Sequence, residues 1–381
     1  MIKNIAYICK RELKYISGDK KLLFIIFAFP LLGLTLFNIM YGEHIVLHIK
    51  TAVWDQSNTS ASRSVIRAFE DSDRFNVVAA ADSEAQLKKM IESREVQAAV
   101  VIPPDFSREI KKGKSTKVLV IVNGTNMLYS NAVLSSANEI VGTISGGAAV
   151  AALEGKGLLP ESAYHTAQPV EYALRIWYNP TFNYANFLIL GLLATAVQQV
   201  TLLYIAVAIV REKTSGAVRE LLDRGISPLE LVAGKVLTYL AANLASLNMV
   251  LAICVFVFKI PFNGSILNLL ILELLFIGAI LAVGIFLSVV SKTELEATQY
   301  SMLVALPSFL FSGYTWPVDS MPGIIKAISA ILPLTYFCSN LRDIALMNIG
   351  LGVMKGDILT LALMNAVFLP LGILLFRRQC R

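Results

Sequence analysis

Long apolar stretches recur along the C-terminal half of the chain and occur once near its start. A helix rises about 1.5 Å per residue, so roughly 20 apolar residues are needed to cross a hydrocarbon core of about 30 Å. The stretches that reach this length predict six transmembrane helices. Their expected ranges are 22–41, 184–210, 228–258, 266–290, 297–312 and 357–376.

Residues 1–21 have a different, amphipathic pattern. Five apolar side chains recur at helical spacing, while basic side chains lie off that stripe. This pattern predicts a helix that lies on the inner leaflet of the membrane. A solvated basic tail that only sets the orientation of the chain is the alternative. The apolar stripe consists of Ile2, Ile5, Cys9, Leu13 and Ile16.

Residues 42–183 are too polar to lie within a membrane. Short apolar runs suited to strands alternate here with helical patterns, which indicates a small α/β or α+β domain. The expected strands are 49–54, 75–79, 97–102 and 118–122, and the expected helices are 60–69, 83–93 and 105–111. A further helical pattern over 127–153 is apolar over too short a length to span, so we expect a packed helix that returns toward the membrane.

Glycine and proline interrupt the segment 313–356, whose apolar pieces are too short to cross a bilayer. We expect re-entrant or interfacial helices there, on the outer side of the membrane. The predicted fold class is therefore an α-helical polytopic membrane protein with six transmembrane helices and an inserted α/β or α+β extracytoplasmic domain.

Composition and charge agree with a membrane protein. Of the 381 residues, 56% are hydrophobic and 16% are charged, which excludes a soluble domain of ordinary makeup. Lys and Arg gather before the first span, after the second span and in the tail 377–381. By the positive-inside rule both termini are cytoplasmic. The net charge of +6 thus reflects topology, and no basic patch interleaved with aromatic residues predicts nucleic-acid binding.

A charged helical segment, 211–227, separates the second and third spans on the cytoplasmic side. Its apolar side chains fall on one helical face and its charged side chains fall elsewhere. Such a segment is suited to docking into a groove on another protein, and a connector whose charges stay in water is the alternative. Ser-Pro-Leu-Glu at 227–230 then has the pattern of a capping box, which predicts a sharply defined start of the third span.

The charged segment begins Arg-Glu-Lys-Thr-Ser-Gly at 211–216, reaches a Leu pair at 221–222, and is followed by the Ser-Pro step and by Gly-Lys at 234–235. In this order the residues resemble the short cytosolic helix of ABC-2 type transporter permeases. Phe-Ser-Gly-Tyr-Thr-Trp-Pro at 311–317 and Leu-Pro-Leu-Thr-Tyr at 332–336 are similar to outer segments of the same family. The larger members of this family carry an extracytoplasmic domain.

The resemblance implies a permease subunit of a bacterial ABC exporter in the cytoplasmic (inner) membrane, with residues 1–21 as its elbow helix. A separate cytoplasmic ABC ATPase subunit would dock on this chain, and two permease chains, identical or different, would enclose the substrate pathway. The residues that the resemblance assigns to ATPase coupling are Arg211, Glu212, Lys213, Gly216, Leu221 and Leu222.

The sequence lacks a nucleotide-binding motif of its own. A P-loop needs G-x-x-x-x-G-K-[ST], so that backbone amides and a lysine hold the phosphates, and no segment matches this pattern. We therefore expect ATP and magnesium to bind the partner subunit and no cofactor to bind this chain. We also expect no catalytic residue, no metal site and no enzymatic activity in this chain.

Three of the polar side chains within predicted spans are candidates for a function, because a charge near the bilayer centre costs at least about 2.5 kcal/mol. Gln198 and Gln199 are in the second span and Glu273 is in the fourth. Each is interpreted either as an interhelix hydrogen-bonding group or as part of a substrate pathway.

Two other classes of function stay open from the sequence alone. One is a secondary transporter, and the other is a membrane-anchored sensor whose external domain binds a ligand. For a transporter, the external domain either receives cargo at the membrane or contacts a periplasmic adaptor.

Overall fold

The computed structural model describes residues 1–41, 46–167, 177–178 and 184–380. The chain forms two compact units. The first consists of Met1–His44 and Ile176–Arg381, and the second, Ile45–Arg175, interrupts the first in sequence. Each unit has its own hydrophobic core. The limits expected for the inserted domain, residues 42 and 183, lie outside the described residues.

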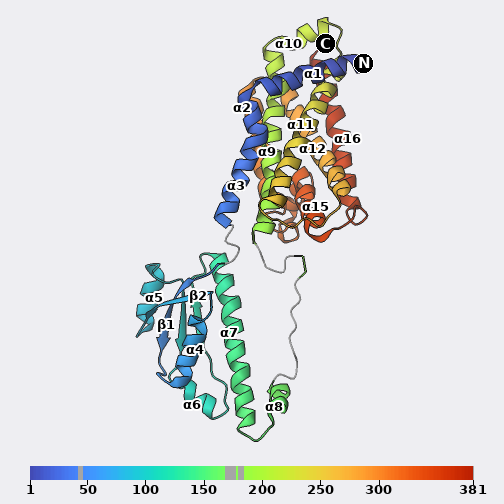
Figure 1. Ribbon diagram of the computed structural model, residues 1–381. Coiled ribbons are helices and arrows are strands. Elements are labelled where there is room, and N and C mark those ends of the chain that lie inside the picture. Colours follow the sequence, from blue (N-terminus) through green and yellow to red (C-terminus); the bar gives the residue numbers. More distant parts are fainter. Residues whose placement is uncertain (42–45, 168–176, 179–183, 381) are drawn as a thin grey trace. The chain divides into compact units, whose positions relative to one another are not determined.

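The first unit is a bundle of helices (Figure 1). Asp19 separates the first two helices, because its carboxylate accepts hydrogen bonds from the N–H groups of Lys21 and Leu22 at 2.9 and 3.2 Å. The N-terminal helices are α1 (Ile2–Gly18), α2 (Lys20–Leu23), the π-helix η1 (Phe24–Ala28) and α3 (Phe29–Tyr41). After the second unit follow α9 (Tyr184–Thr214), α10 (Ala217–Asp223), α11 (Pro228–Phe256), α12 (Ile266–Val290), α13 (Glu294–Phe311), the short 3-10 helix η2 (Val318–Ser320), α14 (Gly323–Ser329), α15 (Pro333–Met347) and α16 (Lys355–Gln379).

Five helical segments in the described part of the chain are long and apolar enough to cross a membrane. The pair α14 and α15, bent by 80°, supplies a sixth if it is one span. The helix α13, the predicted fifth span, packs against α9, but Glu294 and Glu296 in its first turn make it less apolar than the five. That α13 crosses the membrane stays a prediction. The five segments are Lys20–Met40, Ala185–Thr214, Pro228–Phe256, Ile266–Val290 and Lys355–Gln379.

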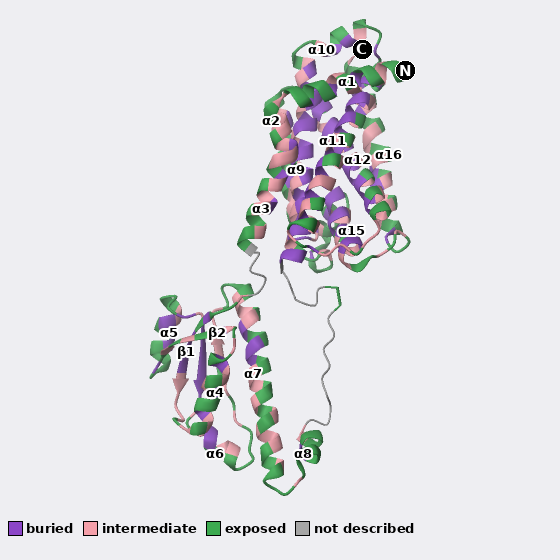
Figure 2. Ribbon diagram, viewed as in Figure 1, coloured by how far each residue is buried: buried purple, intermediate pink, exposed green. Residues whose placement is uncertain are grey.

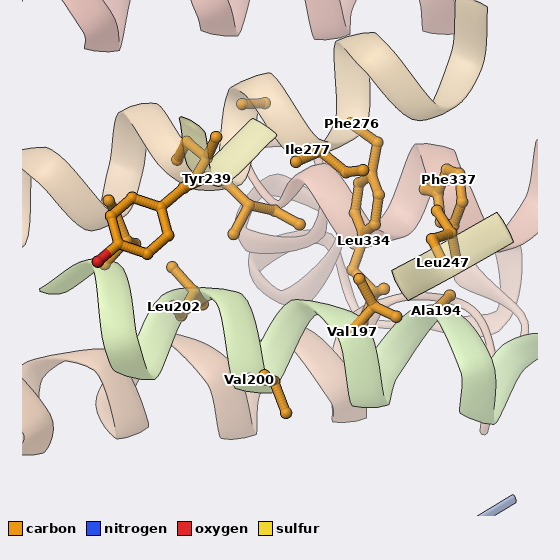
Figure 3. Close-up of a cluster of buried hydrophobic side chains, with 14 of the residues drawn as sticks. Ala194, Val197, Val200, Leu202, Tyr239, Leu247, Phe276, Ile277, Leu334 and Phe337 are labelled. Carbon is orange, nitrogen blue, oxygen red and sulfur yellow. The ribbon is translucent and has the colours of Figure 1, made fainter. Parts of the chain in front are cut away.

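Helices α9 and α12 form the centre of the bundle, and α16 lies at its periphery (Figure 2). In the most apolar part of each helix, 78% of the residues of α9 are buried but only 17% of those of α16. Gly284 of α12 lets α9 approach closely, since a Cβ there would lie 2.2 Å from Cγ2 of Ile205. Figure 3 shows part of this core, where the rings of Phe276 and Phe337 stack with centroids 3.9 Å apart.

The second unit is built around a four-stranded sheet with the strand order β2-β1-β3-β4. Strand β1 is parallel to β2 and β3, and β4 is antiparallel to β3. The alternating pattern predicts these strands and the first three helices within two residues at each end. The elements are β1 (Ile49–Asp55), α4 (Ser60–Glu70), β2 (Phe75–Ala80), α5 (Glu84–Glu92), β3 (Ala98–Ile102), α6 (Phe106–Lys111), β4 (Leu119–Val122), α7 (Met127–Glu154) and α8 (Pro160–Ala167).

Helices cover both faces of this sheet. Residues from α4, α6 and the first half of α7 pack on one face, and Leu87 and Met90 of α5 pack on the other. The buried residues of α7 are Val133, Ser136 and Ala137, so its second half takes little part in this core. The expectation of a packed helix over 127–153 therefore holds for its first half, and that the helix returns toward the membrane stays a prediction.

Candidate functional site

Helix α1 packs along the start of α11, at a position where α11 has a glycine. A Cβ on Gly234 would lie 2.6 Å from Cβ and Cγ2 of Ile8 and 3.3 Å from the carbonyl oxygen of Ile5. Cys9 contacts the same residue, since its Sγ donates to the Gly234 carbonyl oxygen at 3.4 Å. The Gly-Lys step in the sequence is thus a point of close approach between α1 and α11.

The buried side of α1 differs in part from the predicted apolar stripe. Ile16 of the stripe is buried within the bundle, but Ile2 and Leu13 are 80% and 60% exposed. The fully or almost fully buried residues are instead Ile8 and a glutamate, Glu12, which is 2% exposed. Glu12 has charged and polar partners beneath α1, so the face of the helix that packs against the bundle is not its most apolar face. That the apolar stripe lies on the inner leaflet stays a prediction.

Four ionised side chains join α1, α9 and α11. Lys235 of α11 is fully buried, and its Nζ lies 2.9 Å from Oε1 of Glu12 and 3.1 Å from Oε1 of Glu212. Arg11 of α1 reaches the same oxygen of Glu212 at 2.7 Å. The hydroxyl of Tyr239 donates to Glu12 at 3.4 Å. We call Arg11, Glu12, Glu212 and Lys235 the buried ion cluster.

The buried ion cluster has two positive and two negative charges and is neutral as a whole. Removing an ion from water costs several kcal/mol, and this cost is offset only where opposite charges meet in good geometry. Loss of one member therefore leaves an uncompensated charge between three helices. The cluster ties α1 to the C-terminal end of α9 and to the start of α11 at the same time.

The start of α11 makes a second polar contact with α1. The hydroxyl of Ser227 accepts a hydrogen bond from the N–H of Glu230 at 3.3 Å, and the carboxylate of Glu230 accepts one from the N–H of Ser227 at 2.8 Å. This reciprocal pair confirms the predicted capping box. The same carboxylate accepts from Nδ2 of Asn4 at 3.2 Å, so the residue that caps α11 also holds α1 in place.

Arg211 and Lys213 make contacts within the chain on either side of Glu212. The guanidinium of Arg211 lies 4.1 Å from the ring centroid of Tyr15 and donates to the Tyr15 hydroxyl. Burial raises the pKa of this hydroxyl above its ordinary value. Lys213 donates through Nζ to the carbonyl oxygens of Val289 and Ser291 at 3.0 and 3.1 Å. A cation at the C-terminus of α12 is favourable because the last carbonyls of a helix lack backbone partners.

Gly216 separates α9 from α10. Its φ of 78° lies in the left-handed region, which glycine adopts without steric cost. Leu221 of α10 is 4% exposed, and Leu222 packs in part against the same core. The opposite side of α10 is exposed and carries both signs of charge, from Arg219, Glu220, Asp223 and Arg224.

The structure divides the predicted segment 211–227 between the last turn of α9, a glycine turn and α10. It also separates the six residues assigned to ATPase coupling. Glu212 and Leu221 are buried, Arg211, Lys213 and Leu222 are partly buried, and Gly216 is exposed. Their role in coupling stays a prediction, but an approaching protein can touch α10 directly and Glu212 only through its neighbours.

The three polar residues predicted within spans occupy different environments. Gln199 is exposed at the surface of α9, whereas Gln198 is 1% exposed and its side chain has no hydrogen-bond partner among the described residues. Glu273 of α12 is fully buried, and its Oε2 accepts a hydrogen bond from Nδ2 of Asn248 of α11 at 2.7 Å. The described geometry thus gives Glu273 an interhelix hydrogen bond, and a role in a substrate pathway stays a prediction.

The chain is similar to membrane transport proteins over nearly its whole length. Residues 20–374 match the family described as ABC-2 family transporter protein. The chain belongs to this family. The probable multidrug ABC transporter permease YbhS of Escherichia coli (strain K12) is 24% identical over 378 residues, which cover 98% of this chain and 94% of that protein. The inner membrane transport permease YhhJ of the same organism is 25% identical over 99% of this chain and 98% of that protein.

This ABC-2 family member is therefore an ABC transporter permease and a multi-pass membrane protein. Another relative is similar to only part of this chain. ABC transporter G family member 20 of Dictyostelium discoideum is 30% identical over 203 residues, which cover 52% of this chain and only 28% of that protein. The expectation of an ABC-2 type permease from the charged segment and the outer proline steps is thus confirmed.

Sequence reasoning on the ABC-2 permease missed three members of the buried ion cluster, Arg11, Glu12 and Lys235. A signal for Glu12 is present, since it lies four residues after Ile8 and four before Ile16 on one helical face. A lone glutamate on a buried helical face needs a cation. Lys235 lies two turns into an apolar helix and is the natural candidate, but only the fold brings these two residues together across more than two hundred positions.

We expect Glu273→Gln to leave transport by the permease within about twofold of wild type, because the amide oxygen can still accept from Asn248 and an interhelix hydrogen bond in a membrane is worth only about 0.6 kcal/mol on average. Glu273→Leu removes the acceptor and is expected to lower the melting temperature of the purified protein. Transport assays and thermal unfolding of both variants check this. Loss of transport by Glu273→Gln in a fully folded protein would instead assign the carboxylate to the substrate pathway.

Proposed function

We propose that this chain is the permease half of an ATP-driven exporter, coupled to a separate cytoplasmic ABC ATPase. Two permease chains, identical or different, enclose the substrate pathway. The observation that carries the proposal is the buried ion cluster. It joins α1 and α9, the helix that leads into α10, to the membrane helix α11. ATP and magnesium bind the ATPase, and this chain contributes no catalytic residue and no cofactor.

The orientation follows from where the charges gather. Both termini, α1 and α10 lie at one end of the bundle (Figure 1). Basic residues concentrate in these segments, and the positive-inside rule places them in the cytoplasm. The second unit, inserted between α3 and α9, is then extracytoplasmic, and the protein resides in a bacterial inner membrane.

Coupling in this proposal starts at the exposed side of α10. The ATPase contacts Arg219, Glu220 and Asp223, and a displacement of α10 passes through Gly216 to the last turn of α9. Because Glu212 in that turn is held by Lys235 and Arg11, α1 and α11 move with it. Binding of the ATPase shifts the conformational equilibrium only if its contacts differ between the two states. The proposed switch is therefore a change in the α9–α10 angle at Gly216.

The test is whether a nucleotide-binding subunit co-purifies with the permease and is lost when α10 is altered. We expect Arg219→Glu to weaken retention of the ATPase about tenfold, the equivalent of about 1.4 kcal/mol. Lys326→Glu on α14 is the matched control, since Lys326 is also exposed but is neither on α10 nor in the buried ion cluster. Equal retention in both variants would rule out docking on α10.

Reconstituted vesicles decide between this function and the two alternatives. An exporter transports only when the ATPase and ATP are present. A secondary transporter transports without either, and a sensor binds ligand without net flux. Activity in vesicles that hold the permease alone would overturn the proposal.

Two relatives are described as probable multidrug ABC transporter permeases, YbhS and YbhR of Escherichia coli. We extend that description to this chain as part of the proposal. The extracytoplasmic unit then either receives cargo at the outer face of the inner membrane or contacts a periplasmic adaptor. Cross-linking in intact cells distinguishes the two.

A further inference from the structure

The second unit contains a cavity that its own core does not fill. Its volume is about 300 Å³, and it lies between α4, α6, the loop 113–118 and the second half of α7. Apolar side chains line it from several elements, including Val65, Phe106, Ile110 and Val118. Ligand sites in proteins are mostly apolar cavities of this size or larger with a few polar groups at the edge.

The cavity exists because α7 presents small side chains on this side. Ser145, Ala148, Ala149 and Ala152 line the cavity, together with Val141 and Ile144. From residue 141 to residue 152 the helix advances roughly 16 Å, which makes the lined surface long and narrow. Between Glu139 and Glu154 the helix has no charged residue. A helix that is uncharged on all sides is normally covered by apolar material. The long lined surface and its lack of charge together suit an extended hydrocarbon chain.

Part of the cavity lining is basic. Lys114 lines it, and Lys111, Lys112 and Lys117 are on the same short segment. Lys112 lies 3.8 Å from Glu109, but the other three lysines form no salt bridge within the described part of the chain. The segment therefore has surplus positive charge beside an apolar cavity. Its complement is a molecule with an apolar tail and an anionic head.

We propose that this cavity binds a single-chain anionic amphiphile, with the hydrocarbon chain along α7 and the anionic head beside Lys114. A long-chain fatty acid has this chemistry. The site belongs to the second unit alone and does not depend on ATPase coupling. Binding at this site can therefore succeed or fail whether or not the proposed transport function is correct.

The test uses the full-length chain in lipid nanodiscs and a fatty acid that carries a photoreactive diazirine. We expect saturable labelling, displaced by unlabelled fatty acid, on peptides that contain residues 106–118 and 141–152. Ala149→Leu places a larger side chain in the cavity and is expected to reduce labelling about tenfold, because a filled cavity has no room for the chain. Ala151→Leu is the matched control, since Ala151 is on the same helix, is exposed and does not line the cavity.

The head group is tested with a second pair of variants. Lys114→Glu is expected to weaken labelling by the fatty acid several-fold and to leave labelling by the corresponding fatty alcohol unchanged, because only the acid is charged. Lys89→Glu is the control, as Lys89 is exposed on α5, which packs on the other face of the sheet.

Three outcomes would overturn the site. The first is labelling that is neither saturable nor displaced, which indicates partition into the bilayer. The second is an equal effect of Ala149→Leu and Ala151→Leu. The third is cross-linking of this cavity to a segment of a second copy of the chain, with no competition by fatty acid, which shows that protein occupies it.

Discussion

Replacing Lys235 with methionine is expected to lower the free energy of unfolding of the membrane unit by about 3–5 kcal/mol, the range found when one partner of a buried ion pair is removed. Lys235 is fully buried and contacts both Glu12 and Glu212. Without it the cluster has two carboxylates and only Arg11 to balance them. Thermal or denaturant unfolding in detergent, followed by tryptophan fluorescence, measures the change.

A double variant separates charge from packing. Glu12→Leu combined with Lys235→Met removes one charge of each sign and keeps the pair of Arg11 and Glu212 at 2.7 Å. We expect the double variant to recover most of the stability that Lys235→Met loses, because no unpaired charge stays buried. Lys292→Met is the matched control, since Lys292 is exposed and is expected to change stability by less than about 0.5 kcal/mol.

The double variant is expected to recover stability without recovering the coupling of ATP hydrolysis to transport. Its apolar contact between Ile8 and Gly234 still holds α1 against α11, and Arg11 still joins α1 to α9. Lys235, however, no longer links α11 to Glu12 of α1 and Glu212 of α9. We expect ATP-driven transport to stay below wild type although the protein is folded. A Lys235→Met protein as stable as wild type would contradict the ion cluster. Full transport by the double variant would show that the link from α11 to α1 and α9 through Lys235 is structural only.

Gly191→Ala is expected to destabilise the membrane unit by about 1–3 kcal/mol, the usual cost of overpacking a filled core. A Cβ at this position of α9 would lie 1.9 and 2.0 Å from ring atoms of Tyr314. The ring cannot move away easily, because its hydroxyl donates to the carbonyl oxygen of Leu188 at 2.8 Å and its face stacks on Phe187. The loss is measured as a lower melting temperature of the purified permease.

The matched control for this substitution is Gly33→Ala on α3. Gly33 also lies in a membrane helix, but a Cβ there has no neighbour within 4 Å. We expect Gly33→Ala to be neutral or slightly stabilising, since alanine favours helix over glycine by about 1 kcal/mol. Tyr314→Ala is expected to make Gly191→Ala tolerable, because the overlapping ring is gone. If Gly191→Ala costs the same in both backgrounds, the close approach of Tyr314 to α9 is incorrect.

Much of the fold follows from local pattern. The helices α9, α11, α12 and α16 begin and end within four residues of the predicted spans, since a helix that crosses a bilayer must satisfy its own backbone hydrogen bonds. The largest shift is at the C-terminal end of α9, which continues past residue 210 to Thr214. Arg211, Glu212 and Lys213 are good helix formers, so the helix continues through them, and the turn comes only with Gly216.

The candidate site is predicted less completely than the fold. Sequence resemblance selects the segment from Arg211 to Leu222, and the chain does belong to the family that this segment indicates. It does not show that Glu212 faces inward while Arg219 faces outward. That difference depends on where α1 lies, and α1 is separated from α9 by the whole second unit.

What the sequence determines by itself is the placement of five apolar helical segments, the strands of the inserted unit, the cap of α11 and the family. These depend on hydrophobic periodicity and short motifs, which act over neighbouring residues. Only the tertiary structure decides that Glu12, Glu212 and Lys235 meet, and that the second half of α7 borders a cavity. The physical reason is that ion pairing and cavity shape depend on distances between side chains that are remote in the chain, and no local propensity sets those distances.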